Sequence, residues 1–464
     1  MKTRMSSHLT VICLCLTAFT LCSSVSAFEP GGKQPGEVLD ALGIRGGLVV
    51  HVGCEDGSET ARWRANERYV VQGLSRDVAC VEKARQDIRS LGMYGDVTVA
   101  RYDGKHLPYT DNLVNLLVVT DMGCNVSDAE IMRALAPRGA ALVNGRKVVK
   151  SWPADIDEWT HFLHGPNNNA VARDTQVEPP RHMQWVAGPK WGRSHDHLST
   201  VSTVVSANGR IFYIADEGST AAVTAPSEWK LTARDAFSGV LLWKREIPKW
   251  EYQLRPFRSG PAELPRRLVA VGDRVYVTLG YGEPVTALDA ATGETLHTYA
   301  GTENTHEIIA EGGRLYLVVS ERLKEDSTTT GRVLRHMPVW RGSYLEFVTQ
   351  YLPKHIRVVD AESGELLWRK QDTEVEHILP LTLTVGEGKV FFQNAVDLTA
   401  LDAASGEVLW RSERPGVRHR YAWLTPTVVV EDGVVLSADR AVDSPVDTEG
   451  SDHSQFEWRV SANH

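Results

Sequence analysis

The stretch ALDAASGEVLW, residues 400–410, decides the fold of most of this chain. It is typical of two β-strands joined by a tight turn, because Asp402 and Ser405 form turns readily and Gly406 accepts a positive φ. The apolar Val408 and Trp410 then alternate onto one face of the second strand. Related stretches are ARDAFSGVLLW (233–243), ALDAATGETLH (287–297) and VVDAESGELLW (358–368). Four copies of one pattern identify a repeat protein.

Each copy is preceded by another strand, and that strand by a glycine turn and a further strand. The strands directly ahead of the copies are RIFYIADE (210–217), RVYVTLG (274–280), RLYLVVS (314–320) and KVFFQNA (389–395). Four antiparallel strands joined by Gly, Asp and Asn turns make one blade of a β-propeller, which needs neighbouring blades to cover its faces. We therefore expect an all-β propeller over 200–464, with a long insertion at 321–354 that projects from a blade edge.

The propeller predicted in this way is incomplete. Four repeats are followed by part of a fifth, WLTPTVVV (423–430) and GVVLSAD (433–439), and the polar tail 440–464 lacks another copy. Because an unclosed propeller leaves two strand edges unpaired, we expect a truncated version of a longer protein. The alternative is a smaller or irregular propeller completed by a partner or by PPRHMQWVAGP (179–189), which is expected to be the strand leading into the repeats, with Trp185 on its apolar side.

The repeat signature resembles the pyrroloquinoline-quinone (PQQ) repeat of quinoprotein alcohol dehydrogenases and of the periplasmic BamB-type assembly scaffold. The resemblance implies that the repeat glycine turns the chain and that the repeat tryptophan docks onto the turn of the neighbouring blade. His297 stands in place of one tryptophan and implies a weaker dock. The implied structural positions are Asp235, Gly239, Trp243, Asp289, Gly293, Asp360, Gly364, Trp368, Asp402, Gly406 and Trp410.

The same resemblance says less about a cofactor. In the quinoprotein dehydrogenases PQQ lies between a tryptophan and a disulfide of adjacent cysteines, beside a Ca²⁺ that carboxylates hold. This chain has no cysteine after Cys124, and no set of Glu, Asn and Asp maps onto the calcium ligands. The sequence therefore favours a propeller without the quinone. A PQQ-dependent alcohol or sugar oxidoreductase stays the alternative, because other quinoproteins lack the disulfide.

Residues 28–150 have a different organisation, in which strands and helices alternate. Strands are expected at 47–53, 68–74, 96–103, 113–119 and 139–145, and helices at 58–67, 77–91 and 127–135. Alternation at these lengths predicts a doubly wound α/β domain with a parallel sheet.

Three stretches of this domain resemble the class I S-adenosylmethionine-dependent methyltransferases. VVHVGCEDG (49–57) is similar to their glycine loop, LPYTDN (107–112) to the loop before strand four, and EIMRALAPRG (130–139) to an R-x-L-x-P-G-G turn. In that family glycines let the backbone approach the cofactor and an acidic residue ending strand two holds the ribose. The positions implied here are Gly53, Gly57, Ser75 and Asp103.

Departures from that pattern weaken the prediction of methyl transfer. His51 stands where an aspartate is usual, Glu55 replaces the middle glycine, and Ser75 takes the ribose position. Asn115 replaces the usual aspartate before strand four, and two further strands of the complete fold have no clear counterpart. We expect a vestigial or repurposed domain, with an active methyltransferase as the alternative.

Residues 151–199 form a connector that is rich in Trp, His, Pro and Asn, and its segment DEWTHFLHGPNNN (157–169) is expected to be an ordered loop. Two histidines and a carboxylate could build a metal site. The candidates are His161, His164, His195 and His197, with Asp157, Glu158 or Asp196. Because no spacing matches a known closed set, we expect histidines that hydrogen-bond the loop, and no metal.

The N-terminus indicates export. Lys2 and Arg4 precede an apolar run that ends at Leu21, and the sequence V-S-A that closes at Ala27 predicts a signal peptide over 1–27. Lipidation at Cys22 would need a small residue before it, where Leu21 stands. The apolar run is shorter than the roughly 20 residues of a membrane span, so no transmembrane helix is expected after cleavage.

The mature chain keeps Cys54, Cys80 and Cys124, an odd number that excludes an obligatory disulfide framework. Cys54 and Cys124 follow neighbouring strands of the predicted sheet, so they could pair in an oxidising compartment; two free thiols are the other interpretation.

A formal net charge of −9 argues against nucleic acid as a partner. The sequence thus predicts an exported periplasmic or cell-surface protein, related to outer-membrane biogenesis scaffolds, that binds a protein or a saccharide. No catalytic residue is predicted.

Overall fold

The structure is a computed structural model, and it describes residues 34–463 apart from 121–122, 124, 177–178, 180–182, 194–199, 222–224, 251–262, 321–352, 417–425 and 441–457. The predicted signal peptide, Cys124, His195, His197 and almost all of the expected insertion at 321–354 lie outside the described residues. Lys354, at the end of that expected insertion, is the first residue of a strand.

The N-terminal domain is a six-stranded sheet in the order β3-β2-β1-β4-β5-β6. Strands β1 to β5 are parallel and β6 is antiparallel to β5. The strands are β1 (Gly47–Val52), β2 (Tyr69–Ser75), β3 (Val97–Arg101), β4 (Val114–Val119), β5 (Leu135–Val143) and β6 (Arg146–Val149). Strand β6, which is short and half-exposed and follows a tight turn after β5, was not expected from the sequence. The expectation that neither of the two further strands has a counterpart was therefore wrong for one of them.

Four helices accompany this sheet, α1 (Pro35–Leu42), α2 (Gly57–Arg62), α3 (Val78–Ser90) and α4 (Asp128–Ala134). Helix α3 begins where the Asp77 carboxylate accepts a hydrogen bond from the Ala79 N–H at 2.8 Å, and it buries Val81, Ala84 and Ile88 along one side. Residues of α1 and α3 pack on one face of the sheet and residues of α4 on the other, as two separate cores. The predicted doubly wound α/β fold is confirmed.

Five antiparallel sheets follow in the described part of the chain. The first holds β7 (Val201–Ala207), β8 (Arg210–Asp216), β9 (Trp229–Asp235) and β10 (Leu241–Ile247), and the second, after a 3₁₀ turn η1 (Leu264–Arg267), holds β11 (Leu268–Val271), β12 (Arg274–Thr278), β13 (Val285–Asp289) and β14 (Thr295–Thr298). The third holds β15 (Thr305–Glu311), β16 (Arg314–Ser320), β17 (Lys354–Asp360) and β18 (Leu366–Lys370), and the fourth β19 (Thr384–Gly386), β20 (Lys389–Gln393), β21 (Asp397–Asp402) and β22 (Val408–Glu413). The fifth holds β23 (Thr427–Glu431), β24 (Val434–Arg440) and β25 (Trp458–Asn463).

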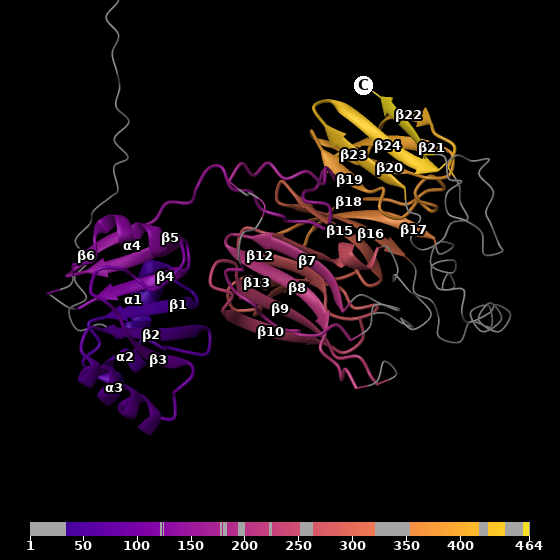
Figure 1. Ribbon diagram of the computed structural model, residues 1–464. Coiled ribbons are helices and arrows are strands. Elements are labelled where there is room, and N and C mark those ends of the chain that lie inside the picture. The colour runs from indigo at the N-terminus through magenta and orange to yellow at the C-terminus, as the bar shows by residue number, and fades with distance from the viewer. Residues whose placement is uncertain are drawn as a thin grey trace, which may run out of the picture.

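These sheets are propeller blades. The first strand of each sheet contacts the first strand of the next, from β7 through β11, β15 and β19 to β23. A separate hydrophobic core lies between each pair of successive sheets. Figure 1 shows the blades from magenta to yellow, beside the indigo N-terminal domain. The predicted all-β propeller is confirmed as a fold.

One expectation for this region was wrong. Described residues 183–190 form no strand, since their backbone pairs with no neighbouring strand, and Met183 is 81% exposed. The tail, which lacks another repeat signature as the sequence indicates, adds β25 to the fifth sheet, where it pairs with β24.

The turn between the last two strands of a blade explains the repeat's Asp and Gly. In ALDAASGEVLW the Asp402 carboxylate accepts the backbone N–H groups of Ala404 and Ser405 at 2.9 and 2.8 Å. Gly406 has a φ of 74° and donates its N–H to the Asp402 carbonyl at 2.8 Å. The same pattern holds the turns that begin at Asp235, Asp289 and Asp360.

Candidate functional site

The positions that the methyltransferase resemblance assigns to a cofactor lie along the carboxyl edge of the N-terminal sheet. Gly53 follows β1 directly with a φ of 100°, and Ser75 is the last residue of β2. Asp103 follows β3, and Gly57 is the first residue of α2. The structure therefore brings Gly53, Ser75 and Asp103 to the ends of neighbouring strands.

These residues do not fit S-adenosylmethionine. The Asp103 carboxylate accepts hydrogen bonds from the backbone N–H groups of His106 and Lys105 and from His106 Nδ1, and these bonds hold its pKa well below the ordinary value. Ser75 is no carboxylate, and its buried hydroxyl accepts a backbone N–H at 3.3 Å. Gly57 lies against a backbone carbonyl of α3, so its missing side chain serves helix packing. The groups that would hold the cofactor are committed to the fold.

His51, at the aspartate position of that family, is likewise part of the structure. Its Nδ1 lies 2.9 Å from Thr60 Oγ1 and its Nε2 3.0 Å from Thr120 Oγ1, and burial lowers its pKa to about 4. The Thr60 hydroxyl donates to Cys54 Sγ at 2.9 Å. Cys54 is a buried free thiol whose pKa burial raises, while Cys124 lies outside the described residues.

Repeat tryptophans lie on the turn of the next blade. Trp243 donates its Nε1–H to the Ala290 carbonyl at 3.0 Å, and Trp368 donates to the Ala403 carbonyl at 3.1 Å. A Cβ added to Gly293 or Gly406 would lie 2.6 or 2.7 Å from these rings, so only glycine lets the rings approach. Each such contact fixes one blade against the next.

The connector and the second blade supply variants of this contact. Trp185, outside any repeat, donates its Nε1–H to the Ala236 carbonyl at 3.0 Å and covers the first turn. In the second blade His297 covers Gly364, and the Tyr299 hydroxyl donates to the Ala361 carbonyl at 2.6 Å. Tyr299 thus supplies a hydrogen bond to the turn, and no bond from the His297 ring is seen among the described residues. The half-buried Trp410 packs on Phe391 and on the core shared with the fifth sheet, and no bond from its ring is seen among the described residues.

The connector joins all five blades at corresponding points. The penultimate residue of each innermost strand donates its backbone N–H to the connector, within 2.7–3.1 Å. The pairs are Ser206 to the Trp159 carbonyl, Ala270 to the Thr160 carbonyl, Ala310 to His161 Nε2, Val385 to the Pro166 carbonyl and Val430 to the Asn167 carbonyl. We call residues 159–167 the hub. It ties the innermost strands of the five described sheets together through four backbone carbonyls and the His161 ring.

The predicted histidines therefore bond the loop. His161 Nε2 accepts a hydrogen bond, so its proton lies on Nδ1, which is 2.7 Å from Thr160 Oγ1, and burial lowers its pKa to about 3. His164 Nε2 lies 2.7 Å from an Asp157 carboxylate oxygen. Within the described ranges no group of three or more His, Cys, Asp and Glu side chains could hold a metal ion.

Buried charges lie beside the innermost strands. The Arg266 guanidinium donates to Asn168 Oδ1 at 3.0 Å and lies 3.4 Å from the Glu307 carboxylate. Lys354 Nζ lies 3.2 Å from a Glu263 oxygen. Burial alone would raise the pKa of Glu263, but Lys354 and His306 hold it well below its ordinary value. The charged groups named here pair with one another, and no cysteine follows Cys124. The described residues therefore do not fit a PQQ site.

A cleft of about 680 Å³ lies between the hub and the first turns of the third, fourth and fifth blades. Val385 and Val430 give it an apolar floor, and Trp152 lies at its edge. The carboxyl side chains that line it are Asp157, Glu158, Glu311, Glu387, Glu431 and Asp432, against a single arginine, Arg173. We call it the acidic cleft. Desolvation raises the pKa of Glu311, and the side chain of this residue makes no hydrogen bond to another described residue.

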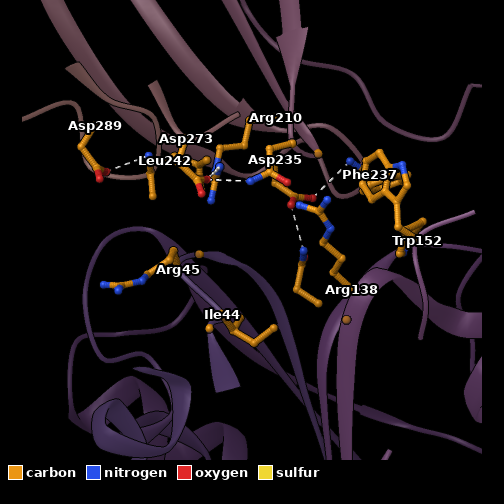
Figure 2. A pocket seen from close by; sticks show the side chains of 18 residues that line it. Ile44, Arg45, Arg138, Trp152, Arg210, Asp235, Phe237, Leu242, Asp273 and Asp289 are labelled. Carbon is orange, nitrogen blue, oxygen red and sulfur yellow. Dashed lines mark hydrogen bonds and ion pairs between the residues drawn. The ribbon is translucent and has the colours of Figure 1, made fainter. Parts of the chain in front are cut away.

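A second cavity, of about 350 Å³, lies between the two domains, and Figure 2 shows it. At its floor Asn115 accepts the Leu48 N–H at 2.8 Å and donates to the Asp235 carboxylate at 2.8 Å. Burial raises the pKa of Asp235 in spite of these bonds. Asn115, which stands where the methyltransferases have an aspartate, is therefore a docking residue between the domains, and sequence reasoning missed this role. We call the cavity the interdomain pocket.

No helix in the described ranges is long and apolar enough to cross a membrane. None of the curated proteins matches the sequence. Among solved structures, BamB from Moraxella catarrhalis is 16% identical with a TM-score of 0.28, over 51% of this chain and 58% of that one. Geranyl diphosphate C-methyltransferase from Streptomyces coelicolor is 19% identical with a TM-score of 0.21, over 23% of this chain and 43% of that one. The [4+2]-cyclase SpnF is 24% identical with a TM-score of 0.20, over 23% and 42%.

This chain spans about half the length of the solved structures that it matches. The family model described as outer membrane protein assembly factor BamB matches residues 182–335 and 227–441, which together cover more than half of the sequence. The matched residues take in all four copies of the repeat that begins the sequence analysis. The chain therefore belongs to the BamB-like PQQ-repeat family, with a doubly wound α/β domain ahead of the propeller.

Proposed function

We propose that this protein is a binding module of the cell envelope, and that neither domain is an enzyme. It binds a basic segment of a protein partner. The observation that carries the proposal is the set of buried ion pairs beside the innermost strands. The hub ties these strands together, and the Arg266–Glu307 and Lys354–Glu263 pairs are buried close to it. We therefore look for the binding site on the surface of the blades.

The acidic cleft favours a basic partner. Six carboxyl groups face one arginine across a volume of about 680 Å³, so a negative potential is focused in a concave site. The apolar floor at Val385 and Val430 adds a surface that excludes water from the contact. A lysine- or arginine-rich protein segment matches both properties, whereas a neutral saccharide would leave the carboxylates without counter-charges.

The proposal includes export. Residues 1–27 have the basic, apolar and small-residue regions of a signal peptide. A phosphatase fused after residue 60 should be active outside the cytoplasm, and loss of the first 27 residues should abolish that activity. The family's description as an assembly factor of the outer membrane supports a protein partner in the same compartment.

The acidic cleft is tested with a fluorescent peptide of alternating lysine and alanine. A Glu311→Gln/Asp432→Asn variant removes two cleft charges and keeps the backbone, since asparagine tolerates the Asp432 φ of 49°. Each exposed charge contributes about 0.2–1 kcal/mol, so binding at low salt should weaken roughly two- to thirtyfold. The matched control, Glu303→Gln/Glu365→Gln, removes two exposed carboxylates elsewhere on the propeller and should bind like the unaltered protein. Equal weakening in both variants would refute the acidic cleft as the binding site.

A further inference from the structure

The interdomain pocket has a basic wall and an acidic wall. The N-terminal domain contributes Arg45 and Arg138, and the propeller contributes Asp235, Asp273 and Asp289 together with Arg210, which pairs with Asp273. Among the described residues no hydrogen bond or ion pair joins an arginine of the first wall to a carboxylate of the second. The two charges thus face each other across the pocket without being neutralised by direct contact.

Arg138 is the cation of this pocket that lacks an ion pair among the described residues, although its charge contributes to lowering the pKa of Asp273. Its guanidinium lies over the Trp152 ring at 4.6 Å and makes no hydrogen bond or ion pair within the described part of the chain. Its backbone has a φ of 62°, a conformation that disfavours a long side chain, yet the N–H is held by the Lys150 carbonyl at 2.9 Å. The stacked and planar guanidinium is well suited to bind a carboxylate.

Asp289 is the uncompensated anion. One carboxylate oxygen accepts the N–H groups of Ala291 and Thr292 at 2.9 and 2.8 Å, and the other has no described partner. Asp273, by contrast, is paired with Arg210 at 2.8 Å and with Asn208 at 2.7 Å. The free acceptor of the acidic wall is therefore the second oxygen of Asp289.

We propose that the interdomain pocket binds a short peptide of two or three residues, with its free carboxylate on Arg138 and its free ammonium on Asp289. A simple anion would be repelled by the aspartates and a simple cation by the arginines, whereas a molecule with both charges complements both walls. Figure 2 shows Asp289 at one end of the pocket and Arg138 on the side of Trp152, with Asp273 and Arg210 between them, so a ligand that carries its two charges at its two ends can contact both. Two extended residues span roughly 7 Å, and about 350 Å³ is within the range of small-ligand sites.

The proposal is tested by calorimetric titration of the full chain with three peptides. Dialanine carries both charges, N-acetyl-dialanine lacks the ammonium, and dialanine amide lacks the carboxylate. Each lost charge-assisted contact should weaken binding by about tenfold or more. Dialanine without measurable binding at millimolar concentration, or capped peptides that bind as tightly as dialanine, would overturn the proposal.

Two variants assign the ends of the peptide. Arg138→Gln should weaken the binding of dialanine by about tenfold but leave the binding of dialanine amide unchanged. Asp289→Asn should likewise weaken the binding of dialanine and leave the binding of N-acetyl-dialanine unchanged. The matched controls are Arg89→Gln, whose guanidinium lies 4.6 Å over the Tyr94 ring, and Asp360→Asn, which holds the same turn in the third blade. Both controls should bind dialanine normally. A loss in the controls equal to that in the variants would also overturn the assignment.

Apart from Trp152, the interdomain pocket shares no lining residue with the acidic cleft. Failure of dialanine to bind would therefore leave the proposed binding of a basic segment in the cleft intact, and failure in the cleft would leave the pocket intact.

Discussion

The hub makes the propeller sensitive to mild acid through His161. Its Nε2 must stay unprotonated to accept the Ala310 N–H, and burial lowers its pKa from the ordinary 6.5 to about 3. In the unfolded chain the same imidazole gains a proton below pH 6.5. Its contribution to stability is therefore complete above pH 6.5 and is lost as the pH falls toward 3.

The size of the effect follows from proton linkage. Each pH unit below 6.5 costs about 1.4 kcal/mol of unfolding free energy for one histidine that stays neutral only in the folded state. His51 and His355, whose pKa burial lowers to about 4 in both cases, act in the same direction. From pH 6 to pH 5 the three histidines together should remove roughly 4 kcal/mol.

The assay is urea unfolding followed by tryptophan fluorescence at intervals between pH 5 and pH 7.5. A His161→Gln variant keeps an acceptor for the Ala310 N–H but binds no proton, so its stability should fall with pH less steeply by about 1.4 kcal/mol per unit near pH 5. The control Val359→Ala, in the buried core beside the second blade, should lose about 1–2 kcal/mol at every pH without a change of slope. An unchanged slope in His161→Gln would refute the assignment of the neutral imidazole.

Three further predictions concern the contacts between parts of the fold. Asn115→Asp should set a carboxylate against Asp235 and weaken domain docking by about 2 kcal/mol or more, measured as faster hydrogen exchange in the turn at 235–239; unchanged exchange would contradict it. Tyr299→Phe should cost about 0.5–1.5 kcal/mol in urea unfolding, because the Ala361 carbonyl loses the Tyr299 hydroxyl and keeps the Arg274 guanidinium as a donor; a stability equal to that of the unaltered protein would be contrary to this reasoning. Trp243→Phe should lower the free energy of unfolding by about 1 kcal/mol more than Trp410→Phe, since Trp243 donates a hydrogen bond to the next turn and the Trp410 ring donates none to a described residue. Equal losses of stability would exclude that bond as the cause.

Local patterns could be predicted from the sequence because their causes are local. The Asp and Gly of ALDAASGEVLW act on backbone groups within four residues, so the pattern alone predicts the turn and the strands around it. The alternation of strands and helices up to residue 143 likewise predicts a doubly wound parallel sheet, since each element signals its own type.

What escaped prediction depends on partners far along the chain. Asn115 bonds to a residue 120 positions away, and its sequence context gives only its place in a methyltransferase-like strand. His297 and Tyr299 together replace a tryptophan contact. This replacement cannot be predicted from the sequence, because it depends on a carbonyl of the third blade. The hub loop has no periodicity of its own, because its five bonds are set by the spacing of the blades. Sequence alone gives no signal for such bonds, apart from the unusual density of Trp, His and Asn.

We propose that the propeller and the α/β domain bind a protein partner and use neither S-adenosylmethionine nor PQQ. Calorimetric titration of the purified chain with S-adenosylmethionine, and separately with PQQ and Ca²⁺, tests this proposal most directly. The hydrogen-bonded Asp103 and Ser75 and the buried ion pairs beside the innermost strands predict no saturable heat with either ligand. Micromolar binding of either one would contradict the proposal.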